Sequence, residues 1–122
     1  MKKILIIEDE KMLTEIYEER FKREGFEVCS AVSAEEGFEK TKELIPDIII
    51  LDILLPRENG TEFLEKIRNI DELKDIKVIA YSNYDDTETR EKAMKLGAKD
   101  YLIKTNYTPK EILDLVNKYI EE

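Results

Sequence analysis

Several apolar runs in this sequence end in a polar side chain that could take part in chemistry. The stretch IIILDILLPRENG, residues 48–60, places Asp52 directly after four apolar residues. A carboxylate at the end of a run that predicts a buried strand is costly unless it is paired or used. Comparable polar groups end or follow three other apolar runs: Glu8, Asp9, Ser82 and Lys104.

Together these groups would suit phosphoryl transfer. Carboxylates gathered at one place raise one another's pKa unless a cation joins them. Hard oxygen ligands favour Mg²⁺, so Glu8 and Asp9 are expected to hold Mg²⁺ with Asp52 as a further ligand. Asp52 is also the candidate nucleophile, because a carboxylate can attack phosphorus and form an acyl phosphate. Lys104 would supply a fixed positive charge, and Ser82 a hydroxyl donor for a phosphoryl oxygen.

These residues can meet only if the strands that carry them lie side by side. Short apolar runs alternate with charged amphipathic segments five times, which predicts five strands and five helices. The runs are Ile4–Ile7, Phe26–Ala31, Ile48–Leu51, Val78–Ser82 and Tyr101–Ile103. Such alternation predicts an α/β protein, a doubly wound (βα)5 fold whose parallel sheet has helices on both faces. The first, third and fourth runs are the most apolar and should be central, which gives the strand order 2-1-3-4-5. In that order ligands bind beyond the carboxyl ends of the strands.

Local signals place the helices between these runs. Ser33 with Glu36, and Thr108 with Glu111, have the spacing of a capping box at a helix start. The first and fourth helices should end at two glycines, Gly25 and Gly97. Apolar residues at helical spacing predict the buried faces of the first, third and fifth helices: Met12, Leu13, Ile16, Tyr17 and Phe21; Phe63, Leu64 and Ile67; and Ile112, Leu113, Val116 and Ile120.

The composition argues against several classes of function. The 122 residues suit one domain, expected to span 1–122, and no apolar run is long enough to cross a membrane. A net charge of −9 argues against nucleic-acid binding and favours a basic partner or a divalent cation. A single cysteine, Cys29, and the lack of histidine exclude an intramolecular disulfide and histidine-based triads, and argue against a zinc cluster. The N-terminal apolar run is too short for a signal peptide, so the expected location is the cytoplasm.

Over almost its whole length the sequence resembles the receiver domains of bacterial two-component response regulators, including the single-domain chemotaxis type. The motifs are IIEDE, IIILDILLPRENG, VIAYSN and KLGAKDYLIK. The resemblance implies a flavodoxin-like fold and phosphorylation of Asp52 by a sensor histidine kinase, a phosphotransfer protein or a small phosphodonor. It also implies a backbone carbonyl ligand for Mg²⁺ at Leu54 and a switch hydroxyl at Ser82. Tyr101 matches the aromatic that changes rotamer, and Lys104 matches the family's lysine.

The function implied by this resemblance is a phosphorylation-driven signalling switch, not a turnover enzyme. Phosphate on Asp52 would draw Ser82 inward, let Tyr101 follow, and reshape the surface of the fourth helix, fifth strand and fifth helix. That surface is also a candidate homodimer contact. The downstream partner is either a separate protein or a fused output domain, and the sequence leaves both open. Taken alone, Tyr101 also fits an ordinary core residue of an edge strand.

Some positions depart from the family pattern. Glu8 stands where aspartate is common, and Thr105 follows Lys104 where the family usually has a proline with a cis bond. Leu54 and Tyr84, two residues after Asp52 and Ser82, are bulky. We expect these two side chains to hinder the water that would attack a phosphorylated aspartate, which makes that state long-lived.

Other functions fit less of the sequence. A phosphatase with an aspartyl intermediate would need a general acid two residues after the nucleophile, where Leu54 stands. A flavin or nucleotide carrier would need a phosphate-binding loop after the first run, where the acidic segment EDEKM stands. A pseudo-receiver, which binds partners without phosphorylation, keeps the fold and stays open because of the unusual segment KTNYTP after the fifth run.

Overall fold

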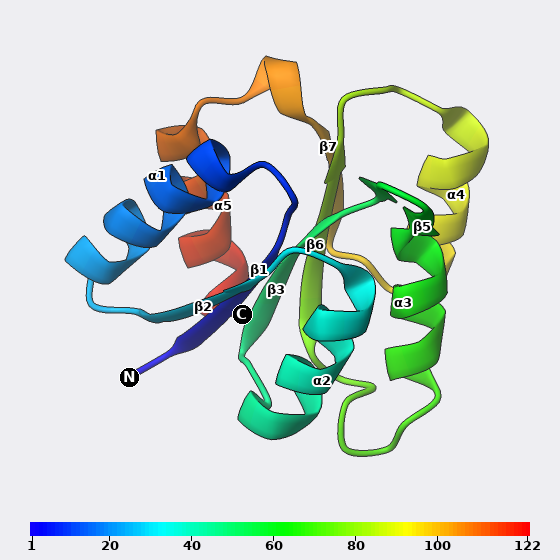
Figure 1. The fold of residues 1–122 in the computed structure, drawn as a ribbon, viewed down its shortest axis with the longest axis horizontal. Coiled ribbons are helices and arrows are strands. Elements are labelled where there is room, and N and C mark those ends of the chain that lie inside the picture. Colours follow the sequence, from blue (N-terminus) through cyan, green and yellow to red (C-terminus); the bar gives the residue numbers. More distant parts are fainter.

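A five-stranded parallel sheet forms the centre of this computed structural model, which describes residues 1–122 (Figure 1). Across the sheet the strands are β2 (Glu27–Ala31), β1 (Lys3–Ile7), β3 (Ile48–Asp52), β6 (Lys77–Ser82) and β7 (Asp100–Ile103). The predicted order 2-1-3-4-5 is confirmed, with β6 and β7 as the fourth and fifth strands of the sheet. A short antiparallel hairpin, which was not predicted, follows β3 and consists of β4 (Leu54–Leu55) and β5 (Glu58–Asn59).

Helices cover both faces of this sheet, as the alternation predicts (Figure 1). One face carries α1 (Lys11–Arg23) and α5 (Pro109–Ile120), and the other carries α2 (Ala34–Leu44), α3 (Gly60–Arg68) and α4 (Thr87–Lys95). A single turn of 3-10 helix, η1 (Lys104–Asn106), follows β7. No helix is both long and apolar enough to cross a membrane.

The strands separate two hydrophobic cores, one under each helix layer. Side chains alternate between the faces along each strand, so β3 contributes Ile48 and Ile50 to the α1–α5 core and Ile49 and Leu51 to the other. Every residue of β3 is buried. A strand buried on both faces reads as a continuous apolar run, which is the pattern that placed this strand at the centre.

Most of the predicted helix ends are found. Thr108 and Glu111 form the complete capping box, with the Glu111 N–H donating to Thr108 Oγ1 at 3.2 Å and the Thr108 N–H to Glu111 Oε1 at 2.8 Å. At α2 only half of the box forms, because Ser33 accepts from the Glu36 N–H while the Glu36 carboxylate accepts from the N–H of Val32. The two glycines after α1 and α4 have positive φ angles, 93° at Gly25 and 84° at Gly97.

The predicted buried face of the first helix is partly wrong. Tyr17 and Phe21 are buried, but Met12 is 77% exposed and Ile16 is 39% exposed. Successive residues of a helix are rotated by about 100° around its axis, which places the buried Thr14 on a different side of α1 from Met12 and Ile16. The face of α1 that meets the sheet is therefore narrower than the apolar pattern suggests.

Candidate functional site

Four side chains on the α1–α5 face of the sheet meet at the carboxyl ends of the strands. Asp52 ends β3, Tyr81 is the last residue but one of β6, and Glu8 and Lys104 directly follow β1 and β7. Each continues a row whose earlier members lie in the α1–α5 core: Ile4 and Ile6, Ile48 and Ile50, Ile79, and Leu102. Alternation along neighbouring parallel strands therefore brings these four side chains to one place.

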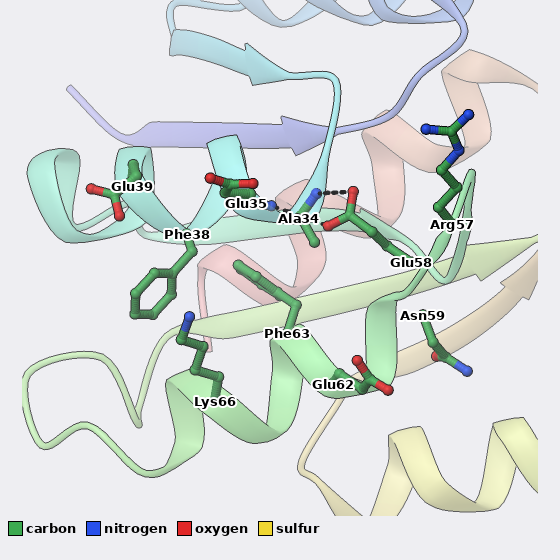
Figure 2. A pocket seen from close by; sticks show the side chains of 10 residues that line it. All are labelled: Ala34, Glu35, Phe38, Glu39, Arg57, Glu58, Asn59, Glu62, Phe63 and Lys66. Carbon is green, nitrogen blue, oxygen red and sulfur yellow. Dashed lines mark hydrogen bonds between the residues drawn. The ribbon is translucent and has the colours of Figure 1, made fainter.

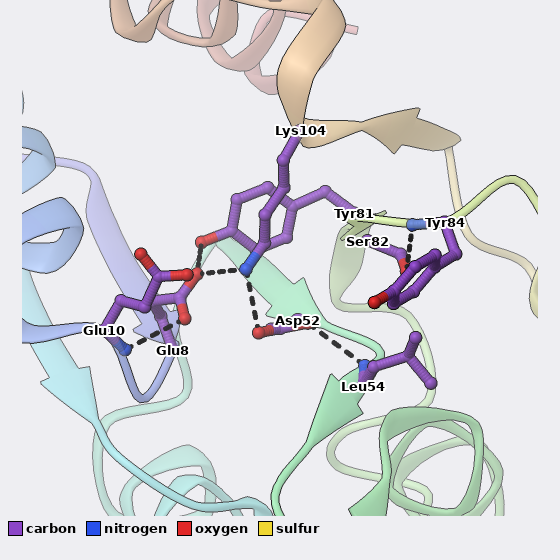
Figure 3. Close-up of polar contacts among 8 residues, drawn as sticks. All are labelled: Glu8, Glu10, Asp52, Leu54, Tyr81, Ser82, Tyr84 and Lys104. Carbon is purple, nitrogen blue, oxygen red and sulfur yellow. Dashed lines mark hydrogen bonds and ion pairs between the residues drawn. The ribbon is translucent and has the colours of Figure 1, made fainter.

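Lys104 lies between two buried carboxylates (Figure 3). Its Nζ donates to Glu8 Oε1 at 2.7 Å and to Asp52 Oδ2 at 2.9 Å. The side chains of Glu8, Asp52 and Lys104 are 0%, 4% and 9% exposed. Buried charges are costly unless they are paired, and here one ammonium is shared by two carboxylates. The Lys104–Thr105 peptide is trans, and Lys104 begins the 3-10 turn η1.

The remaining negative charge can hold a cation. One carboxylate oxygen from each of Glu8, Asp9 and Asp52 lies within 4.8 Å of the other two, and Asp9 is exposed. Adjacent ligands of an octahedral Mg²⁺ lie about 3 Å apart and opposite ligands about 4.2 Å, so these oxygens would move closer together to hold one ion. The donor set, two buried carboxylates and the exposed carboxylate of Asp9, provides the hard oxygen ligands that Mg²⁺ prefers.

Burial and hydrogen bonding set the protonation of these groups. Burial raises the pKa of Asp52 to about 6, although Lys104 opposes the shift. Burial alone would also raise the pKa of Glu8, but hydrogen bonds from Lys104, Tyr81 and the Glu10 N–H outweigh it and lower that pKa. Burial would lower the pKa of Lys104, but its two carboxylate partners raise it instead. At neutral pH both carboxylates are therefore ionised around one ammonium.

Two further predicted residues, Ser82 and Tyr101, lie on the opposite face of the sheet. Ser82 ends β6 and is fully buried, and Tyr101 on β7 is 3% exposed. The Tyr84 N–H donates to Ser82 Oγ at 3.1 Å, and the Tyr101 hydroxyl donates to the Tyr84 carbonyl at 3.4 Å. The backbone of Tyr84 thus joins Ser82 to Tyr101. The guanidinium of Arg90 lies 4.9 Å from the centre of the Tyr101 ring.

Leu54 approaches Asp52 through its backbone. Its N–H donates to Asp52 Oδ1 at 3.0 Å, which fixes the carboxylate from the side opposite Lys104 (Figure 3). The role of the Leu54 carbonyl as a metal ligand stays a prediction. The side chain of Leu54 is 45% exposed and that of Tyr84 is 68% exposed, so both lie at the surface next to the site.

One member of the site was not recognised from the sequence. Tyr81 lies inside the run Val78–Ser82, from which the sequence predicts only a buried strand. Its hydroxyl donates to Glu8 Oε1 at 2.5 Å, and Lys104 Nζ lies 4.6 Å from the centre of its ring. A signal was present, because the hydroxyl of a buried tyrosine needs a polar partner.

A separate surface hollow lies between α2 and α3, beneath the β4–β5 hairpin (Figure 2). Phe38 and Phe63 form its apolar part. Glu58 of the hairpin accepts from the N–H groups of Ala34 at 3.2 Å and Glu35 at 3.3 Å, and so caps the start of α2. The buried carboxylates and lysine that meet at the carboxyl ends of the strands are the better candidate site, because buried charges are costly unless they are paired or used.

Comparisons with known proteins point to one family. The model described as "Response regulator receiver domain" matches residues 4–117. The chain is 32% identical over 118 residues to the chemotaxis protein CheY of Thermotoga maritima, and the match covers 96% of each protein. It is 36% identical over 104 residues to "Probable C4-dicarboxylate response regulator DctR" of Halalkalibacterium halodurans, which covers 84% of this chain and 44% of DctR. The chain therefore spans less than half of DctR but nearly all of the chemotaxis protein.

A solved structure agrees with these matches. A CheY-like response regulator receiver domain protein from Methanospirillum hungatei has a TM-score of 0.92 at 28% identity, over 99% of this chain and 94% of the other. The matched segment contains all five strands of the sheet except Lys3 of β1, and it includes Glu8, Asp52 and Lys104. This chain belongs to the response regulator receiver domain family.

Proposed function

We propose that this chain is a phosphorylation-driven switch in which Asp52 is the phosphoacceptor. Membership of the receiver family assigns it to phosphorylation-dependent signalling. The observation that supports Asp52 is the pair of contacts that Lys104 makes with Asp52 and Glu8, beside the exposed carboxylate of Asp9. This arrangement provides a nucleophile, a fixed positive charge and a set of cation ligands at the place where the strands end.

The phosphoryl transfer follows from these groups. A carboxylate oxygen of Asp52 attacks phosphorus, the bond from phosphorus to the donor breaks, and the donor leaves with the electron pair of that bond. Lys104, already paired with Asp52, offsets charge on the acyl phosphate. When bound by Glu8, Asp9, Asp52 and the Leu54 carbonyl, Mg²⁺ would neutralise the phosphoryl oxygens.

The switch would act through Ser82 and Tyr101. A Ser82 hydroxyl that donates to a phosphoryl oxygen would move toward Asp52 and draw with it the Tyr84 backbone, to which it is hydrogen-bonded. Tyr84 also accepts from the Tyr101 hydroxyl, so Tyr101 would respond. The surface of α4, β7 and α5 would then change, and it is our candidate for partner binding and for homodimer formation.

The partners follow from the chemistry of the family. We propose a phosphohistidine on a sensor histidine kinase or on a phosphotransfer protein as donor, and a small phosphodonor as its substitute in vitro. The output would be a separate protein or a domain fused to this one, and the setting the cytoplasm. The chain would catalyse only its own phosphorylation and dephosphorylation, and residues 1–122 would form one receiver domain.

Intact mass spectrometry tests the proposal. Wild-type protein incubated with Mg²⁺ and phosphoramidate should gain one phosphoryl group, which adds about 80 Da by its formula. The reaction should require Mg²⁺, and base should remove the added group. Asp52→Ala should gain none. Asp71→Ala should behave as wild type, because the Asp71 side chain is 91% exposed in the loop between α3 and β6, at the amino-terminal ends of the strands. A folded wild type that gains nothing would instead favour the pseudo-receiver, which binds partners without phosphorylation.

A further inference from the structure

We propose that Tyr81 is a positioning residue of this site, whose hydroxyl and ring hold Glu8 and Lys104 in the arrangement that binds Mg²⁺. The inference rests on the proposed function, because it concerns the same cation site. Neither the resemblance nor the comparisons give a role to this position.

The side chain of Tyr81 extends from β6 across β3 to reach Glu8. It is fully buried on β6, in register with Asp52 on β3. Glu8 follows β1, on the other side of β3, so β1 and β6 are roughly 10 Å apart at the spacing of neighbouring strands. Only a long side chain can cover that distance, and the tyrosine hydroxyl is the polar group at its end.

The contacts of Tyr81 join the anionic and cationic members of the site (Figure 3). Glu8 Oε1 accepts from the Tyr81 hydroxyl at 2.5 Å and from Lys104 Nζ at 2.7 Å. Glu8 Oε2 accepts from the N–H of Glu10 at 3.0 Å. With three donors on its two oxygens, the Glu8 carboxylate has one defined orientation. The Lys104 ammonium also lies 4.6 Å from the centre of the Tyr81 ring, within the range of a cation–π contact.

The simpler explanation is that Tyr81 only fills the core. Its ring does pack there, 6.4 Å from the ring of Tyr17. Phenylalanine would fill the same space without the hydroxyl, however, and the hydroxyl makes the shortest contact to Glu8. The two explanations therefore differ in what the loss of one oxygen atom should do.

The contact with the Tyr81 hydroxyl depends on the length of the Glu8 side chain. Aspartate at this position would be shorter by one C–C bond, about 1.5 Å, and its carboxylate would withdraw from the Tyr81 hydroxyl. Tyr81 and Glu8 thus form a matched pair. The hydroxyl should matter when residue 8 is glutamate and should lose its effect when residue 8 is aspartate.

The first experiment is Mg²⁺ titration calorimetry on unphosphorylated Tyr81→Phe, alongside the dependence of phosphorylation rate on Mg²⁺. Loss of a group that orients a metal ligand weakens metal binding about tenfold or more. We expect the Mg²⁺ dissociation constant to rise about tenfold, while the rate at saturating Mg²⁺ stays within about twofold of wild type. Tyr17→Phe, from the same buried aromatic cluster, should change neither quantity by more than about twofold. A Tyr81→Phe dissociation constant within twofold of wild type would overturn the inference.

A double-mutant cycle tests whether Tyr81 acts through Glu8. In a Glu8→Asp background, Tyr81→Phe should change the Mg²⁺ dissociation constant by less than about twofold. An undiminished tenfold effect there would mean that Tyr81 acts on the fold and not on Glu8, and would overturn the inference. Calorimetry is independent of phosphorylation, so a wild type that binds Mg²⁺ but takes no phosphoryl group counts against the proposed function alone.

Discussion

Gly60 packs against the backbone of Asp52 so closely that a β-carbon at Gly60 would lie 2.9 Å from the Asp52 carbonyl oxygen. The same β-carbon would lie 2.8 Å from Cα of Ile53, and the Gly60 N–H donates to the Ile53 carbonyl at 2.7 Å. Gly60 is also the first residue of α3. The start of α3 therefore supports the backbone that carries Asp52.

Gly60→Ala should reduce both stability and phosphorylation. Either α3 or residues 52–54 must move to admit the methyl group, because both clashing atoms belong to backbone. We expect the free energy of unfolding, measured in urea, to fall by about 1–3 kcal/mol. Phosphorylation by phosphoramidate should also slow. Glu62→Ala, at an exposed position of the same helix, should stay within about 0.5 kcal/mol of wild type. Wild-type values for Gly60→Ala would show that this close approach imposes no constraint.

The sequence was sufficient to predict the strand order of the sheet and to predict that the polar residues at the strand ends lie close together. Strand type and order follow from the apolar runs, and once the order is known the ends of β1, β3 and β7 must share one edge. What it could not provide was the face on which each end residue lies. Every residue of Ile48–Leu51 is apolar and buried. The run therefore has no alternation of apolar and polar residues that would show which side chains lie on which face of the sheet.

This missing information explains why Tyr81 was not recognised. Its contact with Glu8 depends on both residues ending rows on the α1–α5 face and on a side chain that crosses β3. Met12 and Ile16 illustrate the opposite problem, because apolar spacing alone overstates the width of a buried helix face. Both cases turn on tertiary packing, which a pattern within one segment does not contain.

Asp52 should destabilise the metal-free protein at neutral pH. Burial raises its pKa to about 6, above its ordinary value of 3.8, so between these pH values the folded protein binds more protons than the unfolded chain. The contribution of Asp52 to stability is therefore present at low pH and lost as the pH rises to about 6. Asp52→Asn should be more stable than wild type at pH 7.5 without metal, by about 1–3 kcal/mol. The difference should shrink toward pH 4.

Urea denaturation across this pH range in a chelating buffer measures the effect. Glu8 has a lowered pKa and so contributes in the opposite direction, which is why the comparison is made between variants and not on the wild-type curve alone. Asp71→Asn, at a 91% exposed side chain, is the control and should show no such pH dependence. An Asp52→Asn protein that is less stable than wild type at pH 7.5 would contradict the assigned direction.

Lys104→Met should make the protein depend on a divalent cation for stability. Without the ammonium, the buried carboxylates of Glu8 and Asp52 lose their shared partner. Breaking a buried ion pair from one side costs about 3–5 kcal/mol, so the metal-free melting temperature should fall. Mg²⁺ can then take the place of the lost charge, and the rise in melting temperature on adding Mg²⁺ should exceed that of wild type.

Calorimetric melting with and without Mg²⁺ checks both parts of this prediction. Lys110→Met removes a lysine whose side chain is 73% exposed and should melt like wild type in both conditions. If Mg²⁺ raised the melting temperature of Lys104→Met by no more than it raises that of wild type, Lys104 and the cation would not balance the same negative charge.

Leu54 and Tyr84 should prolong the phosphorylated state. The backbone N–H of Leu54 donates to Asp52 and that of Tyr84 donates to Ser82, while both side chains are exposed to solvent (Figure 3). Next to the site, the two side chains can hinder an attacking water. Leu54→Ala and Tyr84→Ala should each lose the phosphoryl group several-fold faster, followed by intact mass after removal of the donor. Met94→Ala changes a residue of α4 that is 43% exposed, and it should leave the half-life unaltered. An unchanged half-life in both site variants would show that these side chains do not limit the access of water to the acyl phosphate.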